Sequence, residues 1–70
     1  MNLTVNGKPA AIAGKEALTV PELLVELQVE TPEYVTVELN GEILERDNFP
    51  AIIVKNGDAV EFLYFMGGGR

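Results

Sequence analysis

The sequence offers few side chains that could carry out chemistry. Its 70 residues include no cysteine, histidine, tryptophan or serine. A Ser-His or Cys-His nucleophile pair and an imidazole base are therefore excluded. The nitrogen and sulfur ligands of zinc and the thiolates of iron–sulfur clusters are missing as well. The sequence predicts a protein that is not an enzyme and that binds no cofactor or metal ion itself.

Carboxylates are the side chains that remain as candidate acids, bases or metal ligands. Glu42, Glu45 and Asp47 lie close together in the sequence and could attract a cation. Their spacing does not match the calcium loop D-x-[DN]-x-[DN]-G. General acid–base catalysis also needs a cleft that shifts pKa values, and a domain of this size is too small to supply one. We therefore interpret this stretch as a solvated acidic loop.

The second candidate is the glycine run at the carboxyl end. Gly67, Gly68 and Gly69 precede Arg70, with no following helix that could bind phosphate. A backbone without side chains could enter a narrow channel and present a carboxylate to a partner. Ordering it costs about 1–2 kcal/mol per residue, which docking by the folded body must offset. The alternative is a frayed terminus. We expect a folded domain over residues 1–66 and a flexible tail over residues 67–70.

The outward face of the last predicted strand is the third candidate. If Val60 and Phe62 point into the core, then Glu61, Leu63 and Phe65 point the other way. Leu63 and Phe65 would then be exposed apolar residues beside the tail, which is typical of a docking site. The alternatives are that both faces of the sheet are partly covered, or that the strand parity is shifted by one residue.

Short segments of alternating or β-branched residues are the elements that must position these candidates. Three Asn-Gly pairs separate them, and Asn-Gly is a strong turn signal because both residues tolerate positive φ. We expect strands over about Leu3–Val5, Pro9–Ala13, Tyr34–Leu39, Glu42–Leu44, Ile52–Val54 and Ala59–Met66. Residues 45–49 are predicted to be irregular or to form a single helical turn.

One helix is well marked. Thr19 and Glu22 form the capping box T-x-x-E, and Pro21 lies in the first turn, where its missing N–H costs nothing. We expect the helix to end near Gln28, because Pro32 limits it. Its apolar stripe comprises Val20, Leu23, Leu24 and Leu27. Two hairpins flanking one amphipathic helix predict an α+β, β-grasp-like fold, with a mixed sheet of four to five strands and the helix packed across it.

Eleven acidic residues against five scattered basic ones give a net charge of −6. No basic cluster could track nucleic-acid phosphates or an anionic membrane. The charge suits a partner with a basic docking face, or it simply keeps a small protein soluble. The amino terminus lacks the pattern of a signal peptide, and the apolar runs are too short to span a bilayer. We expect a cytoplasmic protein that is a monomer by itself.

Several short motifs together resemble the ThiS family, ubiquitin-like sulfur carriers of thiamin biosynthesis. The main match is Asn56-Gly57-Asp58, then an apolar strand, then Gly68-Gly69. The similarity covers essentially the whole chain. Further matches are Leu23-Leu24, Val37-Glu38-Leu39-Asn40, Ile43-Leu44-Glu45-Arg46 and Phe49.

The resemblance implies a β-grasp fold and a role for the chain end. In such carriers a ThiF-type enzyme uses ATP to adenylate the carboxylate of the terminal glycine. A donor such as a cysteine desulfurase supplies sulfur, and the resulting thiocarboxylate serves a ThiG-type thiazole synthase. This sequence continues past Gly69 to Arg70, so Gly69 lies in a peptide bond. We therefore expect Arg70 to be removed before Gly68-Gly69 can function.

Other functions remain open from the sequence. A carrier could instead serve molybdopterin or cysteine synthesis, because the product is decided by the partners. A β-grasp binding module without chemistry could act through its sheet face, and a protein modifier could be conjugated to lysines. Deleting residues 68–70 would separate the first two classes, because a docking module keeps its affinity whereas a carrier loses sulfur transfer.

Overall fold

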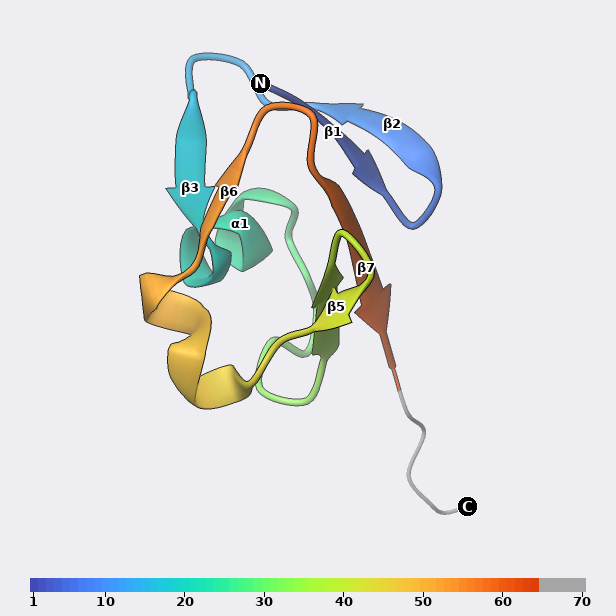
Figure 1. The fold of residues 1–70 in the computed structure, drawn as a ribbon, viewed down its shortest axis with the longest axis vertical. Coiled ribbons are helices and arrows are strands. Elements are labelled where there is room, and N and C mark those ends of the chain that lie inside the picture. The colour runs from blue at the N-terminus through green and yellow to red at the C-terminus, as the bar shows by residue number, and fades with distance from the viewer. Residues whose placement is uncertain (65–70) are drawn as a thin grey trace.

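The computed structural model describes residues 1–64 (Figure 1). The predictions for Phe65, for the boundary at residue 66 and for residues 67–70 lie outside this range and stay predictions. The elements in chain order are β1 (Asn2–Val5), β2 (Lys8–Ala11), β3 (Ala17–Thr19), α1 (Val20–Glu26), β4 (Thr36–Leu39), β5 (Glu42–Ile43), the 3₁₀ helix η1 (Arg46–Ala51), β6 (Ile53–Lys55) and β7 (Ala59–Leu63).

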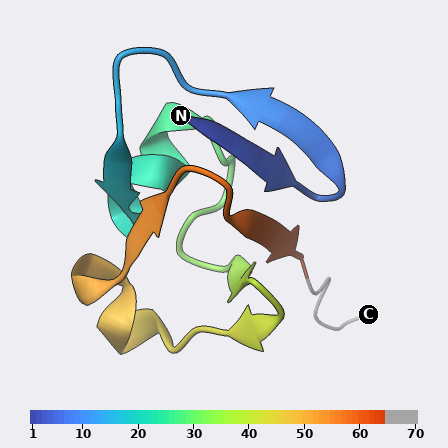
Figure 2. The same cartoon turned by 45° about the horizontal axis from the view of Figure 1, so that its top comes forward.

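The main sheet has five strands in the order β2-β1-β7-β4-β5. Its central strand, β7, pairs parallel with β1 and antiparallel with β4, whereas the two outer pairs are antiparallel hairpins. Both ribbon views place the β1–β2 hairpin on one side of β7 and β4–β5 on the other (Figures 1 and 2). This arrangement confirms the predicted α+β fold with a mixed sheet.

A second, two-stranded sheet was not predicted. β3 and β6 pair antiparallel, with Leu18 opposite Val54, and both of these side chains are buried. We expected a strand over Ile52–Val54, and β6 begins one residue later, at Ile53. β3 follows a loop and has only three residues, so its own pattern is too short to identify a strand. Its β structure depends on the distant partner β6.

The start of α1 agrees with its capping box. The Glu22 N–H donates to the Thr19 hydroxyl at 3.3 Å, and the Thr19 N–H donates to the Glu22 carboxylate at 2.9 Å. The Thr19 backbone N–H is the main cause that lowers the pKa of Glu22, with help from the Thr19 hydroxyl. Two backbone N–H groups that would otherwise be unpaired are thus satisfied within one turn.

The end of α1 lies earlier than predicted. The last helical residue is Glu26, and Gln28 adopts a positive φ of 56°. The Gln28 N–H donates to the Val25 carbonyl, and the Val29 N–H donates to the Leu24 carbonyl, both at 3.0 Å. This pair of bonds is a Schellman motif, which terminates the helix before Pro32 can do so.

The core lies between the main sheet on one side and α1, η1 and the β3–β6 sheet on the other. The predicted stripe of α1 contributes to it, although Leu27 is only partly buried. The expected strand from Tyr34 begins at Thr36, because the backbone N–H groups of Tyr34 and Val35 both donate to the Thr31 carbonyl in a turn. The predicted turn over residues 45–49 is the longer η1, which buries Phe49. The buried apolar residues are Leu3, Ile12, Leu18, Val20, Leu23, Leu24, Val35, Val37, Phe49, Val54, Val60 and Phe62.

Candidate functional site

β7 is the element that leads into the glycine run, and its side chains alternate as predicted. Val60 and Phe62 are 1% and 7% exposed and belong to the core, whereas Glu61 between them is exposed. Leu63 lies on the outward face with Glu61, but it is half-buried and not fully exposed. The reason is its place inside the sheet, where Thr36 of β4 lies directly opposite. The parity of the strand is confirmed, and its role in docking stays a prediction.

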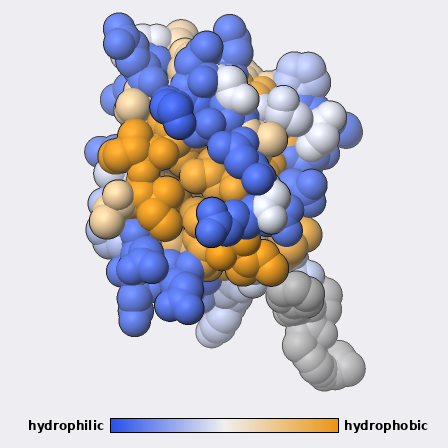
Figure 3. Space-filling view, in the orientation of Figure 1, coloured by the Kyte–Doolittle hydropathy of each residue, from blue (hydrophilic) through white to orange (hydrophobic). Residues whose placement is uncertain are grey.

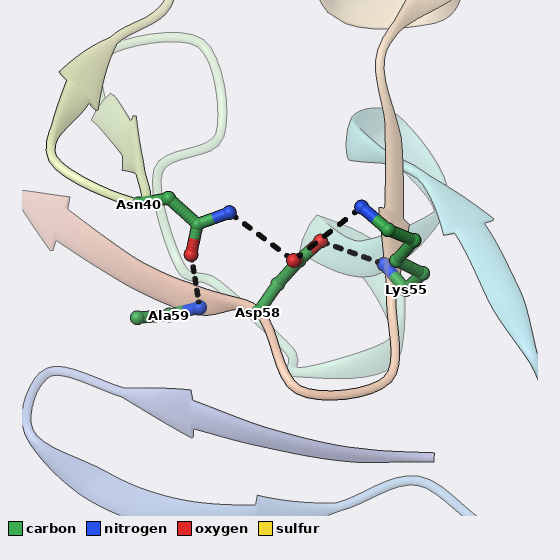
Figure 4. A network of polar contacts seen from close by, with 4 residues as sticks. All are labelled: Asn40, Lys55, Asp58 and Ala59. Carbon is green, nitrogen blue, oxygen red and sulfur yellow. Dashed lines mark hydrogen bonds and ion pairs between the residues drawn. The ribbon is translucent and has the colours of Figure 1, made fainter.

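A polar network around Asp58 fixes the start of β7 (Figure 4). Asp58 is 6% exposed, and its carboxylate accepts the backbone N–H of Lys55 at 2.9 Å and the Asn40 amide at 3.1 Å. The Lys55 ammonium lies 3.7 Å from it. The Asn40 side chain also accepts the backbone N–H of Ala59 at 2.8 Å. The network therefore joins the β4–β5 turn to the first residue of β7.

The environment of Asp58 favours its charged form. Burial raises the pKa of the Asp58 carboxyl, but the backbone N–H of Lys55, the Asn40 amide and the Lys55 charge together hold it below its ordinary value. Hydrogen bonds to an ionised carboxylate stabilise that form. Asp58 is therefore a charged anchor for β7 at neutral pH.

The other two Asn-Gly turns also hold neighbouring strands through their asparagine side chains. Asn6 accepts the backbone N–H of Phe62 at 2.8 Å, and Asn56 accepts the backbone N–H of Asn2 at 2.7 Å. The sequence predicts the turns from the backbone freedom of Asn and Gly, but it does not reveal these bonds. The available signal was the choice of asparagine at each turn, since an amide oxygen can accept a neighbouring N–H. β7 is thus tied at both ends to the strands beside it.

The other candidates for chemistry do not come together. Glu42, Glu45 and Asp47 are exposed, and within residues 1–64 no three acidic side chains are grouped so that they could hold a metal ion. In the same part of the chain, no helix has the length and apolar character needed to cross a bilayer.

An open groove of about 710 Å³ lies on the helix side of β7. Val5 and Phe62 from the sheet, Leu27 and Val29 from the end of α1, and Tyr64 are among the residues that line it. β7 is held by hydrogen bonds at its start and near its end, and residues 64–66 separate it from the glycine run in the sequence. Such an arrangement can present a chain terminus to another protein, and it provides no catalytic group of its own.

A mixed sheet with one helix across it is the ubiquitin-like β-grasp fold, and a glycine run follows its central strand in the sequence. The ThiS family model matches residues 3–69. The chain therefore belongs to the ThiS family, small sulfur carriers of thiamin biosynthesis that are not catalysts. The resemblance read from the sequence is confirmed, and membership of this carrier family agrees with the expectation that the chain is not an enzyme.

Two solved structures are very similar to this chain. The crystal structure of the thiamine biosynthesis protein ThiS from Geobacter metallireducens is 70% identical, with a TM-score of 0.92, over 99% of this chain and 100% of that one. An NMR solution structure of a thiamine biosynthesis protein from the same organism is 68% identical, with a TM-score of 0.81, over 100% of this chain and 90% of that one.

Two curated relatives are much longer proteins. A thiazole synthase of Paramagnetospirillum magneticum is 36% identical over 99% of this chain, and one of Magnetococcus marinus is 35% identical over 100% of it. The chain spans only 20% and 21% of their respective lengths. In each of these proteins, a ThiS-like segment thus forms part of a longer polypeptide named thiazole synthase.

Proposed function

We propose that the carboxylate of Gly69 is the sulfur-carrying group of this protein. The observation that carries the proposal is the family match, which includes Gly68 and Gly69 and ends before Arg70. An amide carbonyl cannot be adenylated, so the Gly69–Arg70 bond must first be hydrolysed, which leaves the carboxylate on Gly69. The folded body then needs no catalytic side chain, in agreement with its lack of serine, cysteine and histidine.

The chemistry proceeds in two transfers on that carboxylate. A ThiF-type partner catalyses its attack on the α-phosphorus of ATP, which forms an acyl adenylate and releases pyrophosphate. The terminal sulfur of a persulfide, formed on a cysteine desulfurase, then displaces AMP. A thiol cleaves the resulting acyl disulfide, and this reduction leaves the thiocarboxylate on Gly69. ATP is used by the partner, and a cytoplasmic location fits that requirement.

A ThiG-type thiazole synthase is the proposed acceptor of the sulfur. Support comes from the two curated relatives, in which a ThiS-like segment belongs to a thiazole synthase polypeptide. Two activities that share one chain in some organisms commonly act on each other when they are separate. The same observation favours thiamin over molybdopterin or cysteine as the pathway served.

The experiment compares two chain ends in a reconstituted reaction. Protein ending at Gly69 and protein ending at Arg70 are each incubated with the ThiF-type enzyme, ATP, a cysteine desulfurase, cysteine and a thiol reductant. Intact-mass spectrometry then reports the exchange of oxygen for sulfur. We expect the exchange only in the protein that ends at Gly69. No exchange in that protein, or exchange in the longer one without loss of Arg70, would contradict the proposal.

A further inference from the structure

The edge of β7 that faces β1 loses its partner strand before β7 ends. The Asn6 N–H donates to the Val60 carbonyl at 2.9 Å, so the backbone polar groups of Val60 face β1. Because alternate residues of a strand direct these groups to the same side, the N–H of Phe62 also points toward β1. β1 has already ended at Val5, and the chain turns away at Asn6 and Gly7. The Phe62 N–H therefore has no backbone carbonyl of β1 beside it.

The side chain of Asn6 takes the place of the missing strand. Its amide oxygen accepts the Phe62 N–H at 2.8 Å in a part-buried bond. The turn itself does not need this side chain, because Asn6 has a φ of 52°, which glycine also adopts. On the other side of β7, the last residue pair is Leu63 with Thr36. Among residues 1–64, the Asn6 amide is the tie on the β1 side that lies nearest the glycine run.

This hydrogen bond lies at the wall of the groove on the helix side of β7. Asn6 and Phe62 both line the groove, together with the apolar side chains of Val5, Leu27 and Val29. Figure 3 shows hydrophobic side chains by β5 and the adjoining end of β7 as well. An N–H in apolar surroundings is unfavourable when it is unpaired, so loss of the amide should loosen the strand from Phe62 onward.

We propose that Asn6 is a positioning residue for the adenylation of the chain end. Its side chain acts through Phe62, which lies seven positions before Gly69 in the sequence, and does not itself contact the reacting atoms. When β7 is held to its last residue, fewer residues must be ordered as the carboxylate of Gly69 enters the partner's active site. Each residue released from β7 adds conformational entropy that this step must overcome. The inference rests on the function proposed above.

Three variants separate positioning from stability. Asn6→Gly keeps the backbone of the turn and removes the amide. Asn6→Asp keeps an oxygen that can accept the Phe62 N–H, and aspartate tolerates positive φ. Asn40→Gly is the matched control, because Asn40 also has a positive φ, of 51°, in an Asn-Gly turn. Its side chain also accepts a backbone N–H of β7, but that of Ala59, at the opposite end of the strand.

The kinetic readout is ATP–pyrophosphate exchange by the ThiF-type enzyme, with every protein ending at Gly69 and shown to be folded by circular dichroism. For Asn6→Gly, kcat should fall about five- to tenfold and KM should stay within about twofold, because the body still docks but fewer complexes are productive. Asn6→Asp should retain at least about half of the parent kcat. Asn40→Gly should keep the parent kcat although its Tm falls at least as much, since it loses two hydrogen bonds.

Hydrogen exchange followed by NMR gives a readout that does not depend on the enzyme. The amide of Leu24, inside α1, reports unfolding of the whole domain. In Asn6→Gly, exchange of the Phe62 amide should become about tenfold faster relative to that of Leu24. In Asn40→Gly, the ratio of the two exchange rates should stay at the parent value.

The positioning role and the proposed function fail in different ways. A parent-like kcat in Asn6→Gly, an equal loss of kcat in Asn40→Gly or Asn6→Asp, or an unchanged exchange ratio for Phe62 would overturn the role of Asn6 and leave the function standing. Absence of pyrophosphate exchange with the parent protein would overturn the proposed function and this inference with it.

Discussion

At the scale of single residues, Gln28 occupies the position after α1 at which glycine is the most favourable residue. Its φ of 56° lies in the left-handed region, where a residue with a Cβ is strained by about 1–2 kcal/mol. Glycine adopts this conformation without that strain and is the usual residue at this position of a Schellman motif. The helix end is therefore a place where the sequence does not have the most stable choice.

Replacing Gln28 tests this interpretation. Gln28→Gly should raise the free energy of unfolding by about 0.5–1 kcal/mol, because relief of strain exceeds the entropy that glycine adds to the unfolded chain. Urea denaturation measures the change. Glu26→Gly, at a helical position, is the matched control and should lower the stability by about 1 kcal/mol. A loss of stability in Gln28→Gly would show that the positive φ carries no cost.

Asp58 is the second residue with a testable contribution, since its folded pKa lies below the unfolded value. Its stabilisation is fully present above the unfolded pKa and is lost as pH falls through the folded pKa. Asp58→Asn should lower stability by about 1.5–3 kcal/mol at pH 7, because charge-assisted hydrogen bonds are lost. The stability difference between Asp58→Asn and the parent should shrink as the pH falls below the ordinary pKa of an aspartate.

Denaturant titrations across the acid range measure that pH dependence. Asp47→Asn, which removes an exposed charge in η1, is the control for the loss of one negative charge. If Asp58→Asn were as stable as the parent at pH 7, the Asp58 network would not anchor β7. The same conclusion would follow if the deficit persisted unchanged into acid.

At the scale of elements, β7 separates a core face from an outward face, for which we predict a role in docking. Phe62→Asp should unfold the domain, because an unpaired carboxylate would lie in the core. Leu63→Asp, on a half-buried outward position, should cost only about 1 kcal/mol but weaken binding to the ThiF-type enzyme about tenfold or more. Circular dichroism and binding titrations measure the two effects. Unfolding by Leu63→Asp, or a parent-like affinity, would contradict this assignment.

The elements that could be predicted from the sequence are those whose causes are local. The capping box at Thr19 and the turns at the Asn-Gly pairs depend on residues within a few positions of each other. β3 could not be predicted, because its strand character comes from pairing with β6 far along the chain. The parity of β7 was predictable from its alternation, whereas the half-burial of Leu63 depends on its cross-strand neighbour.

The contacts of long polar side chains could not be predicted from the sequence either. Arg46 donates to the carbonyls of Pro32 and Val35 at 2.7 and 2.5 Å, and its guanidinium lies 5.1 Å from the centre of the Phe49 ring. These contacts join η1 to the segment before β4. In the sequence, Arg46 is one basic residue in an acidic stretch, and only the folded chain brings its partners together. The same holds for the asparagine bonds that anchor β7.

At the scale of the whole molecule, the absence of catalytic side chains and the anchoring of β7 have one explanation. In the function proposed above, the domain binds a partner and presents its own chain end. The reactive group in that proposal is a carboxylate on Gly69, and the domain contributes docking and position. The family match through residue 69 and the shared polypeptide in two thiazole synthases support this account.

The most direct test is the intact mass of the protein isolated from the cells that make it. The account predicts a species that ends at Gly69, together with its thiocarboxylate, in which one oxygen is replaced by sulfur. Growth with added thiamin offers a comparison, since a lower demand for thiazole should reduce the sulfur-carrying fraction. Finding only protein in which Gly69 is still joined to Arg70, with no form ending at Gly69, would contradict the central claim.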